Sequence, residues 1–517
     1  MNDENNEVSI YPNYLFKKLI LPLIGYTNQE IEKCLESLQY CDSKNIEEEI
    51  KKIPNYRTNC YRKSNYELIF YLLSNKKKEY YKIKLLKNSP KEDIDLICCI
   101  LEVFNNYGNY GEDRNARDNT IQETINNLIV QKGLFNYFFN LKKPNNNINK
   151  LYKCLNNWSL KTYEGHKVCY GFLVDIDENS KDSDDSLDSI CGDFIDFISE
   201  EYSAVFTDVI SSIAEINNDG KFIKFHSLTE NNKIESIDDM SETNLPIRIT
   251  QMIKKYVVNS KIGWFLLNNG DMIIAKKGEI KFIKRSSKWL NFSKETFCNK
   301  INFYLNDKRI SKLLNSIYST VLDISFAHSG GIIAVVNDDD DDTKWGKAIA
   351  IDNENPLVSQ IDLFNNIDCS HSNYIYDHIS NLYENEISKI NSQYESNETS
   401  DQSINDEYFK KEAIKDLKKR LNKKRFLLEI LNKENKFQNV DRKLRAELSG
   451  LDGAIIINFE GEILGCGAII ANTAGSSGGG RGSAARTLSN YGGFAIKIST
   501  DGYVEIFHKG ARIYSIK

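Results

Sequence analysis

The sequence predicts an α/β protein made of several modules, with an α+β arrangement overall. Three observations predict this class. Residues 1–157 have apolar spacing typical of helices, residues 158–298 have short apolar runs broken by turn dipeptides, and residues 299–517 alternate strand-like with helix-like segments. The 517 residues are too many for one hydrophobic core, and 41% hydrophobic with 27% charged residues is ordinary for folded domains.

Residues 1–157 are expected to form a helical N-terminal unit. Apolar residues recur there at three- and four-residue spacing in NQEIEKCLESLQY, KEDIDLICCILEVFNNY and NTIQETINNLIVQKGLFNYFFNL. The aromatic clusters YELIFYLL and LFNYFFNL are interpreted as core, with a partner-binding face as the alternative. We assign no chemistry to this region.

Residues 158–298 are expected to form an α+β domain. Turn sequences at 218–220, 269–270 and 277–278 each end in glycine and predict hairpins. The acidic stretch 178–189 is interpreted as a solvated loop, because it lacks the glycine and closing glutamate of an EF-hand calcium site. His166 and His226 stand alone in the sequence, which favours structural roles over metal binding.

Residues 299–517 begin with a predicted helix, KRISKLLNSIYSTVLDISFAH. It leads through Ser329-Gly330-Gly331 into the buried-strand run IIAVV. The five aspartates at 338–342 follow that strand and are interpreted as a solvated loop rather than a metal site. A charged segment near 385–430 is expected to be an insertion or an exposed helical arm.

Charge and cysteine usage limit the functional classes. A net charge of -6 offers no basic face for a phosphate backbone, so nucleic acid is not expected as a partner. The 11 cysteines form no CxxC pair, and this pattern indicates reduced thiols and a cytoplasmic location. The N-terminus resembles no signal peptide and no window approaches about 18 apolar residues, so no membrane association is expected.

The residues that suggest chemistry lie between 451 and 507. LDGAIIIN predicts a turn followed by a strand, EGEILGCGAII the hairpin partner of that strand, and AARTLSN (484–490) a short helix after a Gly/Ser-rich loop at 472–480. Backbone N–H groups in such a loop can converge on an anion, and Arg481 at its end suits a bidentate contact with phosphate. A flexible connector is the alternative interpretation of the loop.

Asp452 has two interpretations. Its carboxylate can accept backbone hydrogen bonds in the turn before a strand, as aspartate commonly does in Asp-Gly. Alternatively, it holds Mg²⁺ or Mn²⁺ or orients a ribose hydroxyl, while Gly453 lets a nucleotide approach the backbone.

The order of these motifs resembles the diadenylate cyclase domain of bacterial and archaeal cyclic di-AMP synthases. The resemblance covers roughly the last 200 residues without the charged insertion, and rests on Ser329-Gly330-Gly331-Ile332, LDGA (451–454), GGGRGSAA (478–485) and AIKISTDGYVEIF (495–507). It implies a mixed sheet flanked by helices that joins two ATP molecules into cyclic di-AMP and releases pyrophosphate. Because each domain would hold one ATP, it also implies self-association of two domains.

The resemblance implies roles for particular residues. Asp452 matches the catalytic, metal-binding carboxylate, and Arg481 matches the first arginine of the family's phosphate motif. The expected nucleotide-binding residues are Gly453, Ala454, Ser476, Ser477, Gly478, Gly479, Gly480, Gly482 and Ser483. The middle domain is similar, more loosely, to sensor regions that precede some such cyclases.

The chain departs from the family at one place. Gly482 and Ser483 stand where the family has histidine and a second arginine. Losing one charge-assisted phosphate contact costs roughly 2–4 kcal/mol in the transition state. Two hypotheses therefore stay open: a sensor-coupled cyclase, or a cyclase-like domain without turnover that binds ATP or a cyclic dinucleotide as a regulatory module.

Overall fold

The structure is a computed structural model of the 517-residue chain. It describes residues 10–50, 60–64, 66–74, 77–86, 91–107, 119–139, 146–163, 165–177, 194–200, 202–209, 211–228, 245–337, 384, 387–392, 410–415, 436–451, 453–470 and 479–516. The acidic stretch at 178–189, the five aspartates at 338–342 and most of the charged segment near 385–430 lie outside the described residues. Their interpretation as loops and insertion stays a prediction.

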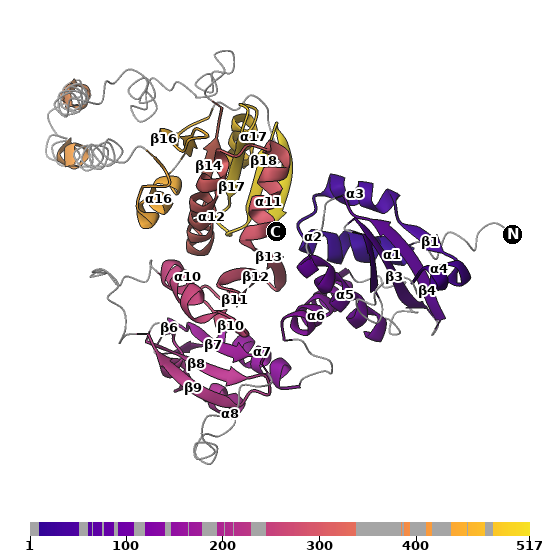
Figure 1. The fold of residues 1–517 in the computed structure, drawn as a ribbon. Helices are drawn as coiled ribbons and strands as arrows, with labels where there is room; N and C mark the ends of the chain where they lie inside the picture. Colours follow the sequence, from indigo (N-terminus) through magenta and orange to yellow (C-terminus); the bar gives the residue numbers. More distant parts are fainter. Residues whose placement is uncertain are drawn as a thin grey trace. The chain divides into compact units, whose positions relative to one another are not determined.

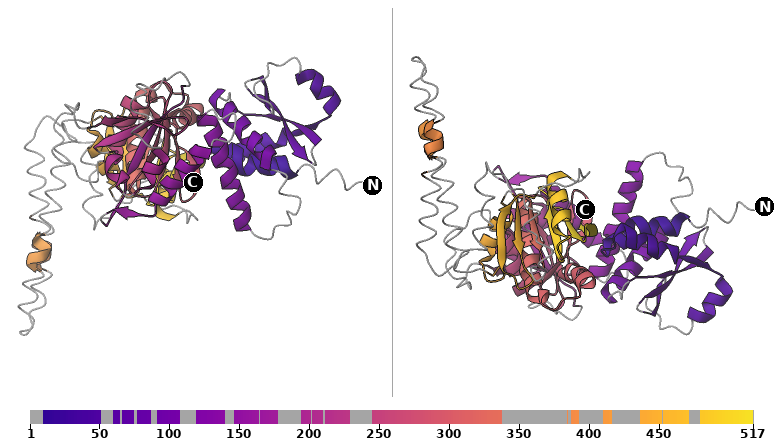
Figure 2. Two further views of the ribbon diagram at one scale, coloured as in Figure 1. Left: turned by 90° about the horizontal axis from the view of Figure 1, so that it is seen from below. Right: turned by 90° about the horizontal axis from the view of Figure 1, so that it is seen from above.

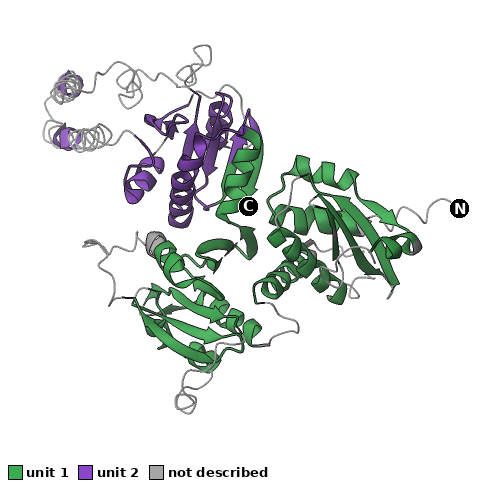
Figure 3. Ribbon diagram, in the orientation of Figure 1, with its two compact units in different colours: residues 1–304, 503–505, 512–517 green, residues 305–502, 506–511 purple. Residues whose placement is uncertain are grey.

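The chain divides into two compact units (Figure 3). The first comprises residues 1–304, 503–505 and 512–517, and the second comprises residues 305–502 and 506–511. The boundary predicted at 298–299 thus lies six residues before the observed one at 304–305. The boundary predicted at 157–158 lies inside the first unit and separates no compact bodies.

The N-terminal part of the first unit contains the predicted helices and also a sheet, which the expectation of a helical unit did not include (Figure 1). Its four strands are ordered β1-β4-β3-β2. The strands are β1 (Gln39–Cys41), β2 (Cys60–Ser64), β3 (Glu67–Ser74) and β4 (Lys77–Lys84). The helices are α1 (Ile10–Leu15), the π-helix η1 (Phe16–Ile20), α2 (Leu21–Leu23), α3 (Asn28–Glu36), α4 (Ser43–Ile50), α5 (Lys91–Tyr107), α6 (Asn119–Phe138) and α7 (Asn146–Trp158).

The omission concerns YELIFYLL, which forms β3. Leu68, Phe70 and Leu72 face the main core of the first unit, whereas Ile69 belongs to a second cluster on the other face. A strand covered on both faces has a continuous apolar run instead of a clear two-residue alternation, so periodicity does not distinguish it from a buried helix. The predicted helices at α3, α5 and α6 are confirmed.

The second sheet of the first unit has seven strands in the order β13-β12-β11-β10-β7-β8-β9. All three predicted hairpins are present in it: β8 with β9, β10 with β11, and β11 with β12. Gly220, Gly270 and Gly278 have φ of +82°, +87° and +73°, which explains the glycine in each turn. The strands are β7 (Tyr170–Asp175), β8 (Ser212–Asn217), β9 (Phe222–Ser227), β10 (Lys261–Leu266), β11 (Met272–Lys276), β12 (Glu279–Arg285) and β13 (Lys288–Asn291).

Smaller elements complete the first unit. A separate two-stranded ladder joins β5 (Thr162–Tyr163) to β6 (His166–Lys167). The remaining helices are α8 (Phe194–Ser199), α9 (Ser203–Phe206), α10 (Leu245–Tyr256) and α11 (Lys294–Leu305). Helix α11 follows β13 and ends at the boundary with the second unit.

One continuous hydrophobic core, from Leu15 to Trp289, joins the N-terminal helices to the seven-stranded sheet. The ring of Phe135 on α6 lies 5.1 Å from that of Trp264 on β10, and the ring of Phe138 lies 5.8 Å from that of Phe282 on β12. The aromatic cluster LFNYFFNL is therefore core, as predicted. Because α6 buries these rings against the sheet, the two regions cannot form separate cores.

A polar cluster lies on three strands of this sheet. The buried carboxylate of Glu215 accepts a hydrogen bond of 2.8 Å from Lys261 and lies 2.5 Å from Nε2 of His226. His226 thus has a structural carboxylate partner. Burial alone would raise the pKa of Glu215, but the hydrogen bonds from His226 and Lys261 and the charges of both groups lower it to about 2.

We predict that this cluster gives the first unit a specific acid sensitivity. A depressed carboxyl pKa stabilises the fold above the ordinary value of 4.5, and this stabilisation is lost as the pH falls towards about 2. Urea unfolding of the protein and of Glu215→Gln should therefore differ most near neutral pH, and the difference should shrink below pH 4.5. A difference that stays constant with pH would contradict the prediction.

A mixed sheet in the order β16-β15-β14-β17-β18-β19 contains the strands of the second unit (Figures 1 and 2). The first residues of β18 and nearly all of β19 are assigned to the first unit. β14 (Gly331–Val335) runs parallel to β15 (Ala454–Ile457) and antiparallel to β17 (Phe494–Ile498). The other strands are β16 (Ile463–Ala468), β18 (Val504–His508) and β19 (Ala511–Ile516), and the helices are α12 (Ile310–Ala327), α16 (Arg442–Ser449) and α17 (Gly479–Leu488). The predicted α/β class and a mixed sheet with flanking helices are confirmed.

Helices cover both faces of this sheet. Ile332 and Ala334 of β14 pack in one cluster with Ala484, Ala485 and Leu488 of α17. The alternate residues of β14 are also fully buried, and α12 and α16, which pack on each other, contact the sheet as well. Sheet residues are consequently accessible mainly where strands begin or end. Within the described part of the chain, no helix is both long and apolar enough to cross a lipid bilayer.

Candidate functional site

Two sequence motifs meet at one edge of the six-stranded sheet. β14 and β15 are parallel neighbours, and Ile332, the second residue of β14, pairs with Ala454, the first residue of β15. Ser329-Gly330-Gly331 and Gly453 directly precede these paired positions. Segments more than a hundred residues apart therefore place their glycines about one strand spacing from each other.

Helix α17 begins at Gly479, five residues before the predicted start at 484. Gly482 and Ser483 are thus buried residues of the first helical turns and not part of a loop. Glycine disfavours helix, but Ala484, Ala485 and Leu488 bury their side chains on the sheet and this packing extends the helix.

The backbone N–H groups of a helix's first turn have no partner within the helix, and in α17 this turn begins at Gly479. A Cβ built on Gly479 or Gly480 would meet no atom within 4 Å, so the space beside this turn is open. Gly479 has φ of +71°, a conformation that favours glycine. The helix dipole and the N–H groups of a first turn favour an anion at this position.

Arg481 lies within this turn and reaches the start of β14. A Cβ built on Gly330 would lie 2.7 Å from Nη1 and 3.1 Å from Cζ of Arg481, and Gly330 itself has φ of +71°. Among the described residues, no hydrogen bond or ion pair holds the guanidinium group of Arg481 in place. The predicted phosphate arginine and the Gly-Gly motif are therefore neighbours, and the guanidinium keeps donors for a ligand.

Lys497 on β17 is a second cation at the same place, and the sequence interpretation missed it. Lys497 pairs with Ile332 of the neighbouring strand β14, and its Nζ lies 3.7 Å from a Cβ built on Gly482. The available signal was a lysine inside the otherwise apolar strand FAIKI. Lys497 and Arg481 together place two positive charges beside the first turn of α17.

The Cβ positions of Gly453 and Ala454 do not point into this space. Gly453 has φ of +115°, and a Cβ there would lie 2.4 Å from the backbone carbon of Gly467 on β16. The backbones of these two segments approach so closely that only glycine fits at position 453. Ala454 is fully buried in the sheet core. Only the backbone at these positions could contact a nucleotide.

Asp452, Ser476, Ser477 and Gly478 lie outside the described residues, so their predicted roles stay predictions. The described residues contain no group of three or more His, Cys, Asp or Glu side chains that could hold a metal ion. Mg²⁺ or Mn²⁺ here would depend on Asp452 and on phosphate oxygens.

Helix α16, which ends at Ser449, is held by several polar contacts. Asp441 caps its N-terminus by accepting a hydrogen bond of 2.9 Å from the backbone N–H of Lys443. Arg442 forms two hydrogen bonds of 2.7 Å with Asp323 on α12. Arg445 is buried and donates a hydrogen bond of 2.8 Å to the carbonyl of Val440. These contacts fix the helix that precedes Leu451 and Gly453.

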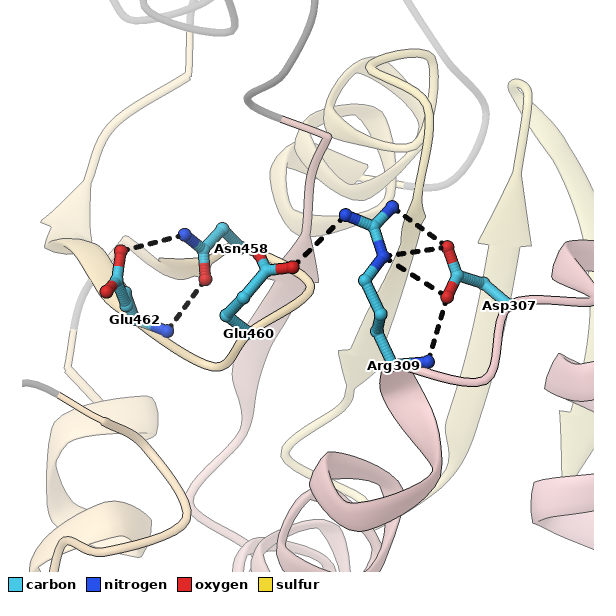
Figure 4. A network of polar contacts seen from close by, with 5 residues as sticks. All are labelled: Asp307, Arg309, Asn458, Glu460 and Glu462. Carbon is cyan, nitrogen blue, oxygen red and sulfur yellow. Dashed lines mark hydrogen bonds and ion pairs between the residues drawn. The ribbon is translucent and has the colours of Figure 1, made fainter.

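A second polar network lies at the opposite end of β15 (Figure 4). Arg309 lies between Asp307, at 2.9 Å, and Glu460, at 3.1 Å, in the turn that joins β15 to β16. In the same turn Asn458 donates a hydrogen bond of 3.0 Å to Glu462. Each carboxylate here has a partner, and the network closes the hairpin. It is structural, and the open cationic edge is the candidate site.

Comparisons of this chain with known protein families, with curated proteins and with solved structures find no match. The functional argument therefore rests on the geometry of this edge and on the motifs described above.

Proposed function

We propose that the second unit binds the phosphates of ATP at this edge, and that two such units condense two ATP molecules into cyclic di-AMP under the control of the first unit. The observation that carries the proposal is the meeting of Arg481, Lys497 and the N-terminal turn of α17 beside Gly330. A triphosphate carries the charge that this arrangement is suited to bind.

Lys497 bears on the main departure from the cyclase pattern. Gly482 and Ser483 replace two side chains that would neutralise phosphate charge, but the ammonium group of Lys497 lies beside Gly482. A lysine from the neighbouring strand could thus restore one positive charge that the helix lacks. Charge neutralisation is the largest part of what a protein contributes to phosphoryl-type transfer.

The proposed reaction is balanced as follows. The 3′-hydroxyl oxygen of one ATP bonds to the α-phosphorus of the other, the bond from that phosphorus to the pyrophosphate oxygen breaks, and the hydroxyl proton is taken up by a base. The 3′-hydroxyl of the second nucleotide then attacks the α-phosphorus of the first in the same way, which releases a second pyrophosphate and closes the ring. Asp452 is the proposed base, and Arg481 and Lys497 stabilise the departing pyrophosphate. A divalent ion, when bound, would neutralise further phosphate charge.

A binding module without turnover remains the second candidate, and one observation favours it. Gly482 and Ser483 are buried in α17 and place no cationic side chain on the phosphates. The same edge would then bind ATP or a cyclic dinucleotide as a regulatory signal.

The two candidates give different results with purified protein, ATP and Mn²⁺ or Mg²⁺. The cyclase proposal predicts cyclic di-AMP in the mass spectrum, formed at a rate per protein that rises with protein concentration because two units must meet. Asp452→Asn should abolish the product and leave ATP binding measurable. Saturable ATP binding without product would reject the cyclase and support the binding module. Absence of any ATP binding would reject both candidates.

A further inference from the structure

The first unit contains a cavity of about 390 Å³, within the size range of small-molecule sites. Its lining comes from the segment after α2, from α5 and α6, from β12 and from α11. All the residues that line the cavity belong to the first unit. The cavity is thus independent of the cationic edge described above.

The inner wall of the cavity is aromatic. Phe138 and Phe282 line it with their rings 5.8 Å apart in an edge-to-face arrangement, and Tyr137 lies 4.8 Å from Phe138. Tyr66 and Phe303, which also line the cavity, are 51% and 59% exposed. A ligand with a flat apolar body would bury these exposed rings and contact the inner ones.

Both ammonium groups that line the cavity already have carboxylate partners. Lys300 is fully buried and forms an ion pair with Glu30, and Lys281 donates a hydrogen bond of 3.2 Å to Glu279. Neither Glu30 nor Glu279 lines the cavity. An anionic ligand would have to compete with these pairs for its positive charge.

Three carboxylates line the cavity as well: Glu92, Asp93 and Glu295. Burial alone would raise the pKa of Glu92, but a hydrogen bond of 2.6 Å from Lys277 and the charges of Lys281 and Lys276 hold it below its ordinary value. Glu92 is therefore ionised at neutral pH. Glu92 is thus paired with Lys277, just as the two lysines are paired with carboxylates. The lining nevertheless holds three carboxylates and two ammonium groups, and this excess of negative charge favours a cation over an anion.

We propose that this cavity binds a small organic cation with an aromatic or hydrocarbon body and an ammonium group. The body would lie against Phe138 and Phe282, and the ammonium group would lie near the carboxylates and the exposed aromatic rings. Ring faces attract cations, and carboxylates bind ammonium groups by charge-assisted hydrogen bonds. Helix α11 contributes Thr296 and Lys300 to the lining and leads directly into the second unit.

The test uses three probes with the same phenylethyl framework: phenethylammonium, phenethyl alcohol and hydrocinnamate, which are cationic, neutral and anionic. Ligand-observed NMR titrations with the full-length protein measure the three dissociation constants. We expect phenethylammonium to bind at least about tenfold more tightly than hydrocinnamate, a difference of about 1.4 kcal/mol. Asp93→Asn combined with Glu295→Gln should weaken binding of the cation and leave the alcohol unchanged.

Two tryptophan substitutions on α11 locate the site. Asn299 lines the cavity and Asn302 does not, and both are exposed. Asn299→Trp should fill the cavity and weaken phenethylammonium binding at least about tenfold, whereas Asn302→Trp should retain it. Equal or tighter binding of hydrocinnamate, binding that survives Asn299→Trp, or no binding of any probe would overturn the proposal. None of these results depends on ATP.

Discussion

Replacing Arg481 with methionine is expected to weaken ATP binding about 10- to 100-fold, because one charge-assisted phosphate contact contributes about 1.5–3 kcal/mol. The substitution keeps most of the side-chain length and removes the guanidinium group beside Gly330. Lys497→Met should weaken binding in the same direction, since its ammonium group lies at the same helix turn. Calorimetric titration with ATP measures both effects.

The matched control lies on the same helix. Arg486 is exposed and its guanidinium lies 5.6 Å from the ring of Phe507, away from the first turn of α17. Arg486→Met should therefore change ATP affinity by less than about twofold, as expected for a distant surface charge. Equal losses for Arg481→Met and Arg486→Met would mean that general charge, and not the edge at Gly330, attracts the nucleotide.

The substitution Asp271→Asn is expected to destabilise the first unit by about 3–5 kcal/mol. Asp271 and Arg285 are both buried, and the guanidinium Nε lies 3.1 Å and 3.0 Å from the two carboxylate oxygens. Asparagine keeps the shape of the side chain but removes the negative charge that faces the buried guanidinium of Arg285. Urea unfolding followed by tryptophan emission measures the loss, because Trp158, Trp264 and Trp289 all lie in the first unit.

An exposed pair of the same chemistry provides the comparison. Arg309 also binds a carboxylate through its Nε and Nη2 atoms, that of Asp307, but its side chain is 42% exposed. Asp307→Asn should cost less than about 1 kcal/mol because water solvates both partners. Replacing Asp271 with leucine and Arg285 with methionine together should restore much of the stability lost in Asp271→Asn. Similar losses at Asp271 and Asp307 would show that burial does not control the effect.

Much of the candidate site was visible in local patterns. The helix before Ser329, the strand after Gly331 and the hairpin of β15 with β16 all appear where periodicity and turn residues predict them. These patterns are reliable because each element is long or is closed by a turn of defined chemistry. The role proposed for Arg481 also came from the sequence, since an arginine after a run of glycines suits phosphate.

Other features depend on contacts between distant residues. β3 became a strand because two separate clusters cover its two faces, and α17 begins early because its alanines pack on the sheet. Lys497 approaches Gly482 only because β17 pairs with β14 under α17. Local periodicity contains no information on which elements become neighbours, and neighbours determine burial and the meeting of charges.

The amino-acid sequence alone was sufficient for the α/β class and the hairpins, because these follow from turn chemistry and periodicity over short stretches; it also singled out Arg481, whose role stays a prediction. Folding decided that the N-terminal and middle regions share one core, that Gly453 serves a backbone crossing, and that two cations meet at one helix end. The physical reason is that burial and electrostatic proximity are properties of pairs of residues far apart in the chain, which only a packed structure brings together.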